Sequence, residues 1–251
     1  MSDELMQRYL RRLGFGSRPE PTWPVLTALV RAHLQTVPFE NLDILAGRRA
    51  ELSTAGALHK VVVQRRGGFC YELNEACGAL LTYLGFSVSR IEARVWLQQQ
   101  REFGPPYDHL ALLVTLPEGV FLTDVGFGDN NRTPMRLPAD ELSDVSGHYT
   151  LAPVAEDLWL LARTERPLYQ LTLAPQPLSA FQSMYRYHQG SPESIFAKGL
   201  ICTRATDDGR ITLSGDRLIV VQGSRRSETV VTDRNRLLEE HFGIVSEGMT
   251  C

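Results

Sequence analysis

The sequence predicts an α+β fold with a helical N-terminal part, a run of strands and a small mixed C-terminal segment. Three observations predict it. Apolar residues recur at helical spacing up to about residue 85. Short β-prone runs bounded by Pro, Gly or Asp follow, over residues 88–162. Beyond residue 190, strand-like runs precede one capped helix. We therefore expect three units, at residues 1–86, 87–190 and 191–251.

The N-terminal part predicts four helices, which start near Asp3, Thr22, Thr54 and Cys70. A turn through 38–41 separates the second from the third. The fourth helix is the most clearly delimited, because its apolar spacing runs from Cys70 to Gly85, where a C-terminal cap belongs.

The strands that follow suggest an antiparallel sheet or a small barrel. The expected strands cover residues 88–97, 110–116, 120–125, 149–153 and 158–162. In the last segment we expect strands at 211–213 and 218–222, and a helix over 232–242 that ends at Gly243.

Composition excludes several classes of function. The chain has 251 residues with 43% hydrophobic and 22% charged residues, and a formal net charge of −3 argues against general binding of nucleic acid or anionic membranes. Its four cysteines are widely spread, and neither CxxC nor HExxH metal spacing occurs. The N-terminus lacks the apolar stretch of a signal peptide. We therefore expect a cytoplasmic protein without metal or membrane partners.

Cys70 is the first candidate for chemistry. It follows Gly67 and Gly68 and opens a predicted helix, where unpaired backbone N–H groups and the helix dipole favour negative charge. A thiol there tends toward thiolate, which is the nucleophilic form. The glycines would let a substrate approach the sulfur. The alternative is a buried cysteine that only fills space.

His109 and Asp124 are the candidate partners. Pro117-Glu118-Gly119 predicts a hairpin whose register sets Asp124 opposite residue 111 or 112, diagonal to His109. An aspartate in such an apolar strand is costly to bury unpaired. We expect Nδ1 of His109 to face Asp124 and Nε2 to face Cys70. Spacing alone leaves the alternative of ordinary surface positions open, and favours it.

The other histidines are weaker candidates. His33 and His59 lie on predicted helices without a nearby acidic partner, and the remaining three lie in loops or at helix ends, where exposure is expected: His148, His188 and His241. Asp108, next to His109, is expected to face solvent, because adjacent strand residues point to opposite faces.

Several segments together resemble the arylamine N-acetyltransferase family. The matching segments are RRGGFCYELN around Cys70, the His109 strand, LTDVGFG around Asp124, VPFENLD from Val37 and YLRRLGF from Tyr9, followed in order by SPESIF, GRITL and HFGI. The resemblance thus covers nearly the whole chain. It implies a helical bundle, an antiparallel β-barrel and an α/β lid, with a core like that of cysteine proteases and transglutaminases. It also implies that Arg66 pairs with Glu40.

The same resemblance implies a Cys70–His109–Asp124 triad and ping-pong acetyl transfer. Acetyl-CoA would donate the acetyl group to Cys70, and an aromatic amine or hydrazine would accept it, as in xenobiotic metabolism. No tightly bound cofactor is implied.

The resemblance also makes Phe39 and Phe127 candidates for the wall of the amine pocket, and Gly126 and Gly128 candidates for binding acetyl-CoA. Asp129 departs from the small or neutral residue usual in the family, and its carboxylate would repel a phosphate unless Arg132 offsets it.

Three alternatives stay open at this point. A macrolactam-forming amide synthase or a cysteine hydrolase or transglutaminase-like enzyme would use the same triad, and a non-catalytic binding module would keep only the fold. The natural acceptor and the oligomeric state are not indicated by the sequence.

Overall fold

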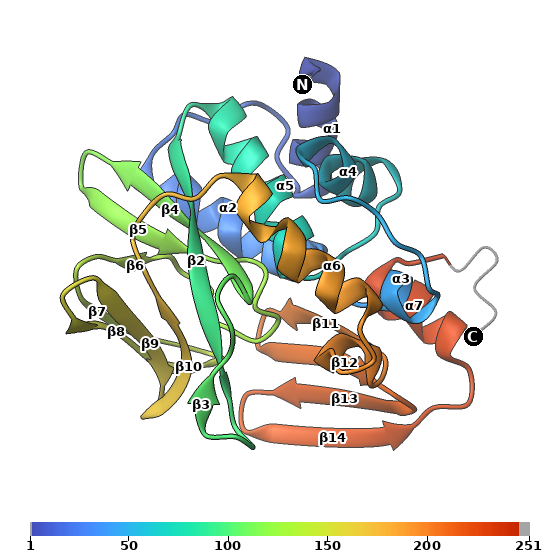
Figure 1. Cartoon of the computed structure of the whole chain (residues 1–251). Helices are drawn as coiled ribbons and strands as arrows, with labels where there is room; N and C mark the ends of the chain where they lie inside the picture. Colours follow the sequence, from blue (N-terminus) through green and yellow to red (C-terminus); the bar gives the residue numbers. More distant parts are fainter. Residues whose placement is uncertain (1, 246–251) are drawn as a thin grey trace.

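The computed structural model describes residues 2–245, and it confirms the predicted α+β class. Helices of the N-terminal half, a nearly closed antiparallel barrel and a second antiparallel sheet are arranged around one helix, α5 (Figure 1). The end of the predicted third unit, residues 246–251 with Cys251, lies outside the described residues.

The predicted N-terminal helices are all present. They are α1 (Asp3–Arg12), α2 (Trp23–Thr36), α4 (Thr54–Leu58) and α5 (Cys70–Leu84). The third continues past Leu58 as a π-helical turn, η1 (His59–Val63). The cap of α1 is Ser2, whose side chain accepts from Leu5 N–H, and not Asp3. Gly85 ends α5 in the left-handed region, with φ of 101°.

α5 is buried on almost all sides, although it carries several polar residues. Its first turn already includes buried Cys70, Tyr71 and Glu72, and its only half-exposed or exposed positions are Thr82 and Tyr83 near the end. A helix in such a position is held by packing against its neighbours and not by intrinsic propensity. Its N-terminus is therefore fixed by the surrounding elements, which positions whatever chemistry Cys70 carries.

The barrel is an antiparallel sheet with strands in the order β6-β5-β4-β2-β10-β9-β8-β7, with β3 paired to β2. The strands are β2 (Ser87–Leu97), β3 (Glu102–Phe103), β4 (His109–Leu116), β5 (Gly119–Thr123), β6 (Met135–Arg136), β7 (Asp140–Asp144), β8 (Gly147–Ala155), β9 (Leu158–Arg163) and β10 (Arg166–Leu171). Arg136 N–H donates to the Asp140 carboxylate at 2.8 Å, which joins the two end strands of the path.

The second sheet has the order β1-β11-β12-β13-β14 and lies beside the barrel (Figure 1). It consists of β1 (Phe39–Glu40), β11 (Ile201–Thr206), β12 (Gly209–Ser214), β13 (Arg217–Gln222) and β14 (Arg225–Val230), and α7 (Arg234–Phe242) packs against it. The expected turn at 38–41 is thus a strand of this sheet. The division at residues 86 and 190 remains a proposal, since β1 comes from the first unit.

The chain segment between barrel and second sheet contains a helix that we did not predict, α6 (Gln182–Gly190), preceded by the short η2 (Leu178–Phe181). Two further short helices, α3 (Leu42–Leu45) and η3 (Ile195–Ala197), flank the second sheet. In Figure 1, α6 (orange) crosses in front of α5 on its way to the second sheet. Over residues 2–245, no helix is long and apolar enough to span a bilayer.

Candidate active site

Cys70 is the first residue of α5, as predicted, and it is 3% exposed. The start of the helix is capped by Glu72, whose carboxylate reaches back and accepts from Phe69 N–H at 3.1 Å. Within residues 2–245, the backbone N–H of Cys70 has no hydrogen-bond acceptor, because a helix leaves its first N–H groups unpaired. That N–H is available to a negatively charged oxygen next to the sulfur.

The two glycines before Cys70 have a different reason from the predicted one. A Cβ on Gly67 would overlap the Pro38 carbonyl oxygen, and one on Gly68 would lie 2.5 Å from the Glu72 carboxylate. Protein atoms that pack against the loop are therefore sufficient to require glycine at both positions. They allow β1 and the Glu72 cap to lie close to the peptide that precedes Cys70.

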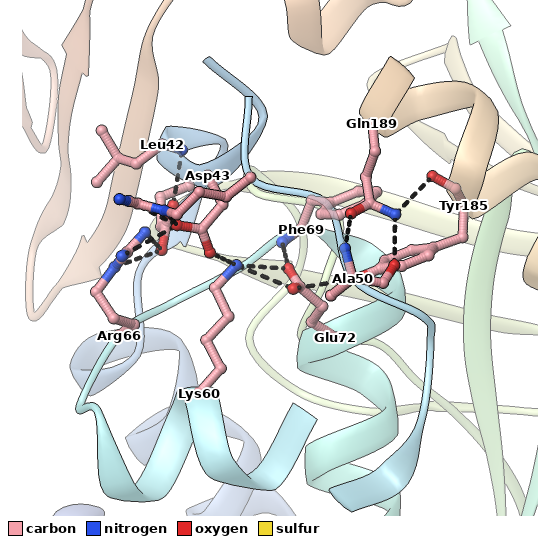
Figure 2. A network of polar contacts seen from close by, with 11 residues as sticks. Leu42, Asp43, Ala50, Lys60, Arg66, Phe69, Glu72, Tyr185 and Gln189 are labelled. Carbon is pink, nitrogen blue, oxygen red and sulfur yellow. Dashed lines mark hydrogen bonds and ion pairs between the residues drawn. The ribbon is translucent and has the colours of Figure 1, made fainter. Parts of the chain in front are cut away.

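A network of largely buried ion pairs holds the loop that precedes Cys70 in place (Figure 2). Lys60 Nζ lies 2.9 Å from Glu72 and 2.8 Å from Asp43. Arg66 donates to Glu40 at 2.7 and 3.0 Å, which confirms the pair expected from the family resemblance. Buried partners of this kind are strongly destabilising to remove singly, because the other charge is left uncompensated. The network ties η1, β1 and α3 to the start of α5.

The predicted hairpin places His109 and Asp124 together. The register pairs Leu112 with Thr123, which puts Asp124 level with residue 111, as expected. His109 opens β4 and Asp124 follows the last residue of β5, and their side chains are joined by a hydrogen bond of 2.8 Å. Both side chains are 2% exposed, so the surface alternative is wrong.

The expected assignment of the ring nitrogens is also wrong. Nε2 of His109, not Nδ1, donates to Asp124 Oδ2. The two residues are diagonal neighbours across the hairpin, and only the distal ring nitrogen reaches that far. Because the carboxylate accepts from Nε2–H, the neutral imidazole has its lone pair on Nδ1. Nδ1 is then the nitrogen left for the Cys70 thiol.

Asp124 accepts further hydrogen bonds that sequence reasoning did not identify, the longest of them from Asn130 Nδ2 at 3.5 Å. Asn74 Nδ2 donates to Oδ1 at 2.8 Å, and the Tyr169 hydroxyl donates to Oδ2 at 3.1 Å. Gly126 N–H donates to Oδ1 at 2.8 Å. Asn74 lies four residues after Cys70 on α5, so an amide on the apolar face of this helix was the available signal. Tyr169 comes from β10, and no local pattern relates it to the hairpin.

The charges of the site are coupled. Burial disfavours the imidazolium form of His109, but Asp124 and Cys70 outweigh it and raise the pKa of the ring to about 10. The pKa of Asp124 is lowered although burial acts to raise it, because His109, Asn74 and Gly126 favour the carboxylate. Burial raises the pKa of the Cys70 thiol, and the facing His109 and the Leu110 backbone N–H oppose that rise. Helix position alone therefore does not favour the thiolate here, and the facing imidazolium of His109 is the group that favours it.

Phe127 and Phe39 occupy different parts of the site. The Phe127 ring is edge-on to His109, with centroids 5.6 Å apart, and 5.3 Å from the Tyr169 ring. Phe39 is buried and packs against Phe196 and the Gly128 backbone. Of these two phenylalanines, Phe127 is the one whose ring packs against a triad side chain.

The two predicted cofactor glycines also differ. A Cβ on Gly126 would lie 2.7 Å from Cys70 Cα, so this glycine allows the loop after β5 to pack against α5. Gly128 adopts φ of 91°, which favours glycine, and it is half-buried against Phe39.

Asp129 is compensated within the protein. Its carboxylate lies 2.9 Å from Arg163 on the barrel and 3.0 Å from Arg210 on β12. Arg132, expected to offset this charge, instead donates to the backbone carbonyls of Thr206 and Gly209. The departure from the family pattern therefore joins barrel and second sheet through an ion-pair bridge.

Two expectations about exposure are wrong. His188 is 3% exposed, and the Asp108 side chain is 11% exposed. They contact each other, with 3.1 Å between Nε2 and Oδ1. The interpretation failed because it treated His188 as part of a loop, whereas it lies on the inner face of α6. His33 is buried too, 2.7 Å from the Tyr9 hydroxyl. Within residues 2–245, no group of three or more metal-ligating side chains could hold an ion.

Comparison with known proteins gives concordant results. The family model described as N-acetyltransferase matches residues 22–249. An arylamine N-acetyltransferase of Mycolicibacterium smegmatis is 38% identical over 221 residues, which cover 84% of this chain and 80% of that protein. One of Escherichia coli is 30% identical over 251 residues and covers 96% and 89%.

Solved structures agree in fold over nearly the full length. An arylamine N-acetyltransferase of M. smegmatis superposes with a TM-score of 0.88 at 34% identity, covering 95% of this chain and 92% of that one. One of Bacillus cereus, described as having a unique Cys-His-Glu catalytic triad, gives 0.90 at 25% identity, covering 98% and 100%. From the family model, the relatives and the shared fold, the chain belongs to the arylamine N-acetyltransferase family of acyltransferases.

Proposed function

We propose that this enzyme transfers the acetyl group of acetyl-CoA to the nitrogen of arylamines or arylhydrazines through an acetyl-cysteine at Cys70. The supporting observation is the buried arrangement in which Asp124 binds Nε2 of His109 and leaves Nδ1 for the Cys70 thiol. A nucleophile, a base and a group that orients the base are then present in one place. A cytoplasmic location remains a prediction from the sequence.

In the first half-reaction, Cys70 reacts as the thiolate, with its proton held on Nδ1 of His109, and Sγ attacks the thioester carbonyl carbon of acetyl-CoA. The carbonyl oxygen becomes negatively charged next to the free N–H of Cys70 at the helix start. When the intermediate collapses, the bond from carbon to the CoA sulfur breaks, and His109 returns the proton to that sulfur. Asp124 stabilises the imidazolium during the transfer.

In the second half-reaction, the amine nitrogen attacks the carbonyl carbon of acetyl-Cys70. His109 removes a proton from the amine, the bond from carbon to Sγ breaks, and the thiol is restored. Arylamines suit this step because their weakly basic nitrogen is unprotonated at neutral pH. The Phe127 ring, edge-on to His109, is positioned to contact an aromatic acceptor.

The decisive experiment is intact-protein mass spectrometry after brief exposure to acetyl-CoA without acceptor. We expect one acetyl group on the wild type and none on Cys70→Ala. Addition of an aromatic amine should remove the acetyl group and release the acetylated amine. An unmodified wild type with acetyl-CoA left intact would refute the proposal.

The same samples separate the alternatives. Release of acetate at one rate with and without amine would indicate a hydrolase. A cysteine that reacts with other thioesters but not with acetyl-CoA would indicate an amide synthase. The absence of any acyl-enzyme, with no effect of Cys70→Ala on ligand binding, would indicate a binding module.

A further inference from the structure

The molecule contains a second histidine–aspartate pair, formed by His188 of α6 and Asp108. Asp108 immediately precedes His109, and the proposed mechanism does not use it. Nε2 of His188 lies 3.1 Å from Asp108 Oδ1, and Nδ1 lies 3.0 Å from the Ser194 hydroxyl. Because a carboxylate only accepts, His188 donates from Nε2, and the Ser194 hydroxyl donates to Nδ1. All the hydrogen-bonding capacity of the ring is therefore satisfied.

The arrangement of Ser194, His188 and Asp108 does not make Ser194 a second nucleophile. Ser194 is 1% exposed, and its oxygen also accepts from Phe196 N–H at 3.2 Å, where it caps η3. Because this oxygen donates one hydrogen bond and accepts another, and because it is covered by protein, it cannot react with a substrate. The role of the cluster is therefore to be sought in what His188 holds in place.

His188 packs against residues that flank Cys70. Its ring centroid is 6.4 Å from that of Phe69 and 6.1 Å from that of Tyr71, the residues on either side of Cys70. The Tyr71 hydroxyl in turn lies 2.7 Å from the Tyr107 carbonyl oxygen, just before Asp108. One side chain thus contacts the neighbours of both Cys70 and His109.

The rest of α6 anchors the helix to the same region. The hydroxyl of Tyr185, one turn before His188, lies 3.3 Å from the Glu72 carboxylate that caps α5. The side-chain amide of Gln189 accepts from the Ala50 N–H and donates to the Ala50 carbonyl oxygen (Figure 2). The helix is therefore fixed independently of the Asp108 contact. A donor fixed in this way can hold the Asp108 carboxylate, and Asp108 immediately precedes the first residue of β4.

Resting on the function proposed above, we propose that the hydrogen bond from His188 to Asp108 sets the position of His109 relative to Cys70, which makes His188 a positioning residue for acyl transfer. The bond links α6 to the start of β4, while the ring contacts link α6 to the start of α5. The distance between the thiol and the imidazole depends on both links.

The test compares His188→Phe, which keeps an aromatic ring but removes both hydrogen bonds, with His188→Gln, which can bond both partners. His148→Phe is the matched control, since His148 also lies between a serine and a carboxylate, at 2.9 Å from Ser143 and 3.0 Å from Glu141, but is 42% exposed on the barrel. Three quantities are measured on each folded variant: the rate of Cys70 alkylation by iodoacetamide at pH 7, the kcat and KM for acetyl transfer, and Tm.

We expect His188→Phe to lower both the alkylation rate and kcat by about 10- to 100-fold, the range expected for a displacement of up to 1 Å, with little change in the KM of the amine. His188→Gln and His148→Phe should stay close to wild type. A merely structural role would lower Tm without changing alkylation or kcat of the folded protein. That result for His188→Phe would overturn the proposal.

Asp108→Ala tests the same bond from its more exposed partner, in case His188→Phe does not fold. It should show the same loss, whereas Asp108→Asn, which keeps an acceptor oxygen, should not; wild-type rates in Asp108→Ala would refute the positioning role. Alkylation does not involve acetyl-CoA, so the result stands apart from the proposed function. If the wild type formed no acetyl-enzyme, the function would fail while the alkylation series still decided the role of His188.

Discussion

The two buried histidine–aspartate pairs use the same donor and acceptor atoms but are surrounded differently. In both, Nε2 lies within 3.1 Å of a carboxylate oxygen. The second ring nitrogen of His109 faces a thiol, whereas that of His188 accepts from a hydroxyl that is itself bound to Phe196 N–H. One ring can take up a proton from a reactive group, and the other has both nitrogens occupied.

The difference shows what distinguishes a catalytic pair from a positioning pair. The carboxylate holds the imidazole in one tautomer in each case. The chemistry is decided by the partner of the other nitrogen and by its freedom to react. The following predictions test that distinction, in decreasing order of expected effect.

The largest effect is expected from replacing the ring itself. His109→Gln should slow acetylation of Cys70 by about 10²- to 10⁴-fold, the usual contribution of a general base. His188→Gln should leave the rate nearly unchanged, because the amide can satisfy both Asp108 and Ser194. Rapid-quench mass spectrometry of the acetyl-enzyme measures both rates. Equal losses in the two variants would contradict the distinction between the pairs.

A smaller effect is expected from the glycines beside each pair. A Cβ on Gly126 would lie 2.7 Å from Cys70 Cα, whereas one on Gly104 would lie 2.5 Å from Asp108 Oδ2. Gly126→Ala must shift backbone, so we expect a loss of about 1–3 kcal/mol in the free energy of unfolding and slow acetylation. Gly104→Ala should move only the Asp108 carboxylate from His188, and reduce alkylation of Cys70 with little loss of stability.

Urea unfolding and iodoacetamide alkylation measure the two effects. Gly199→Ala is the control, since a Cβ there would meet no atom within 4 Å. A Gly126→Ala protein as stable and as reactive as this control would show that the loop after β5 does not need its close approach to α5.

The last prediction involves no change in reaction rate and concerns the pH dependence of stability. The pKa of His109 rises from 6.5 to about 10 on folding, so the stabilisation is fully present below pH 6.5 and is lost as the pH rises toward 10. Its upper limit is about 1.4 kcal/mol per pH unit over that range. Asp124→Asn removes the main charge that raises this pKa and should flatten the curve.

Because burial also raises the pKa of the Cys70 thiol, the comparison is made between Cys70→Ala and Cys70→Ala with Asp124→Asn. The free energy of unfolding is measured by urea titration from pH 6 to pH 10. Parallel curves for the two proteins would mean that Asp124 does not raise the pKa of His109.

The N-terminal helices and the hairpin could be predicted because their signals are local. The helix from Cys70 to Gly85 was predicted to the residue, and the two-residue turn after Leu116 fixed the register that brings Asp124 to His109. The strand at 39–40 could not be predicted, because it is formed by pairing with distant segments, chiefly β11, some 160 residues later. A two-residue segment carries no periodicity of its own.

The polar residues around the triad were missed for a related reason. The sequence analysis assigns the segment before residue 190 to the barrel and predicts no helix there, although Phe181, Tyr185 and His188 recur at helical spacing. His188 therefore appeared exposed. Asn74 and Tyr169 gave no signal of their own, since a buried amide or hydroxyl differs from an exposed one only by its partners.

The family resemblance implied which cysteine, histidine and aspartate meet, whereas local patterns in the sequence determined the α+β class, the helix that begins at Cys70 and the hairpin register of Asp124. Short-range periodicity, caps and one tight turn decide these features within about 20 residues at a time. Only the tertiary structure decided which nitrogen of His109 faces Asp124, why Gly67 and Gly126 must be glycine, and that His188 bonds Asp108 across 80 residues. Such contacts depend on how the buried faces of distant elements pack, and that is set by the whole chain and not by any local pattern.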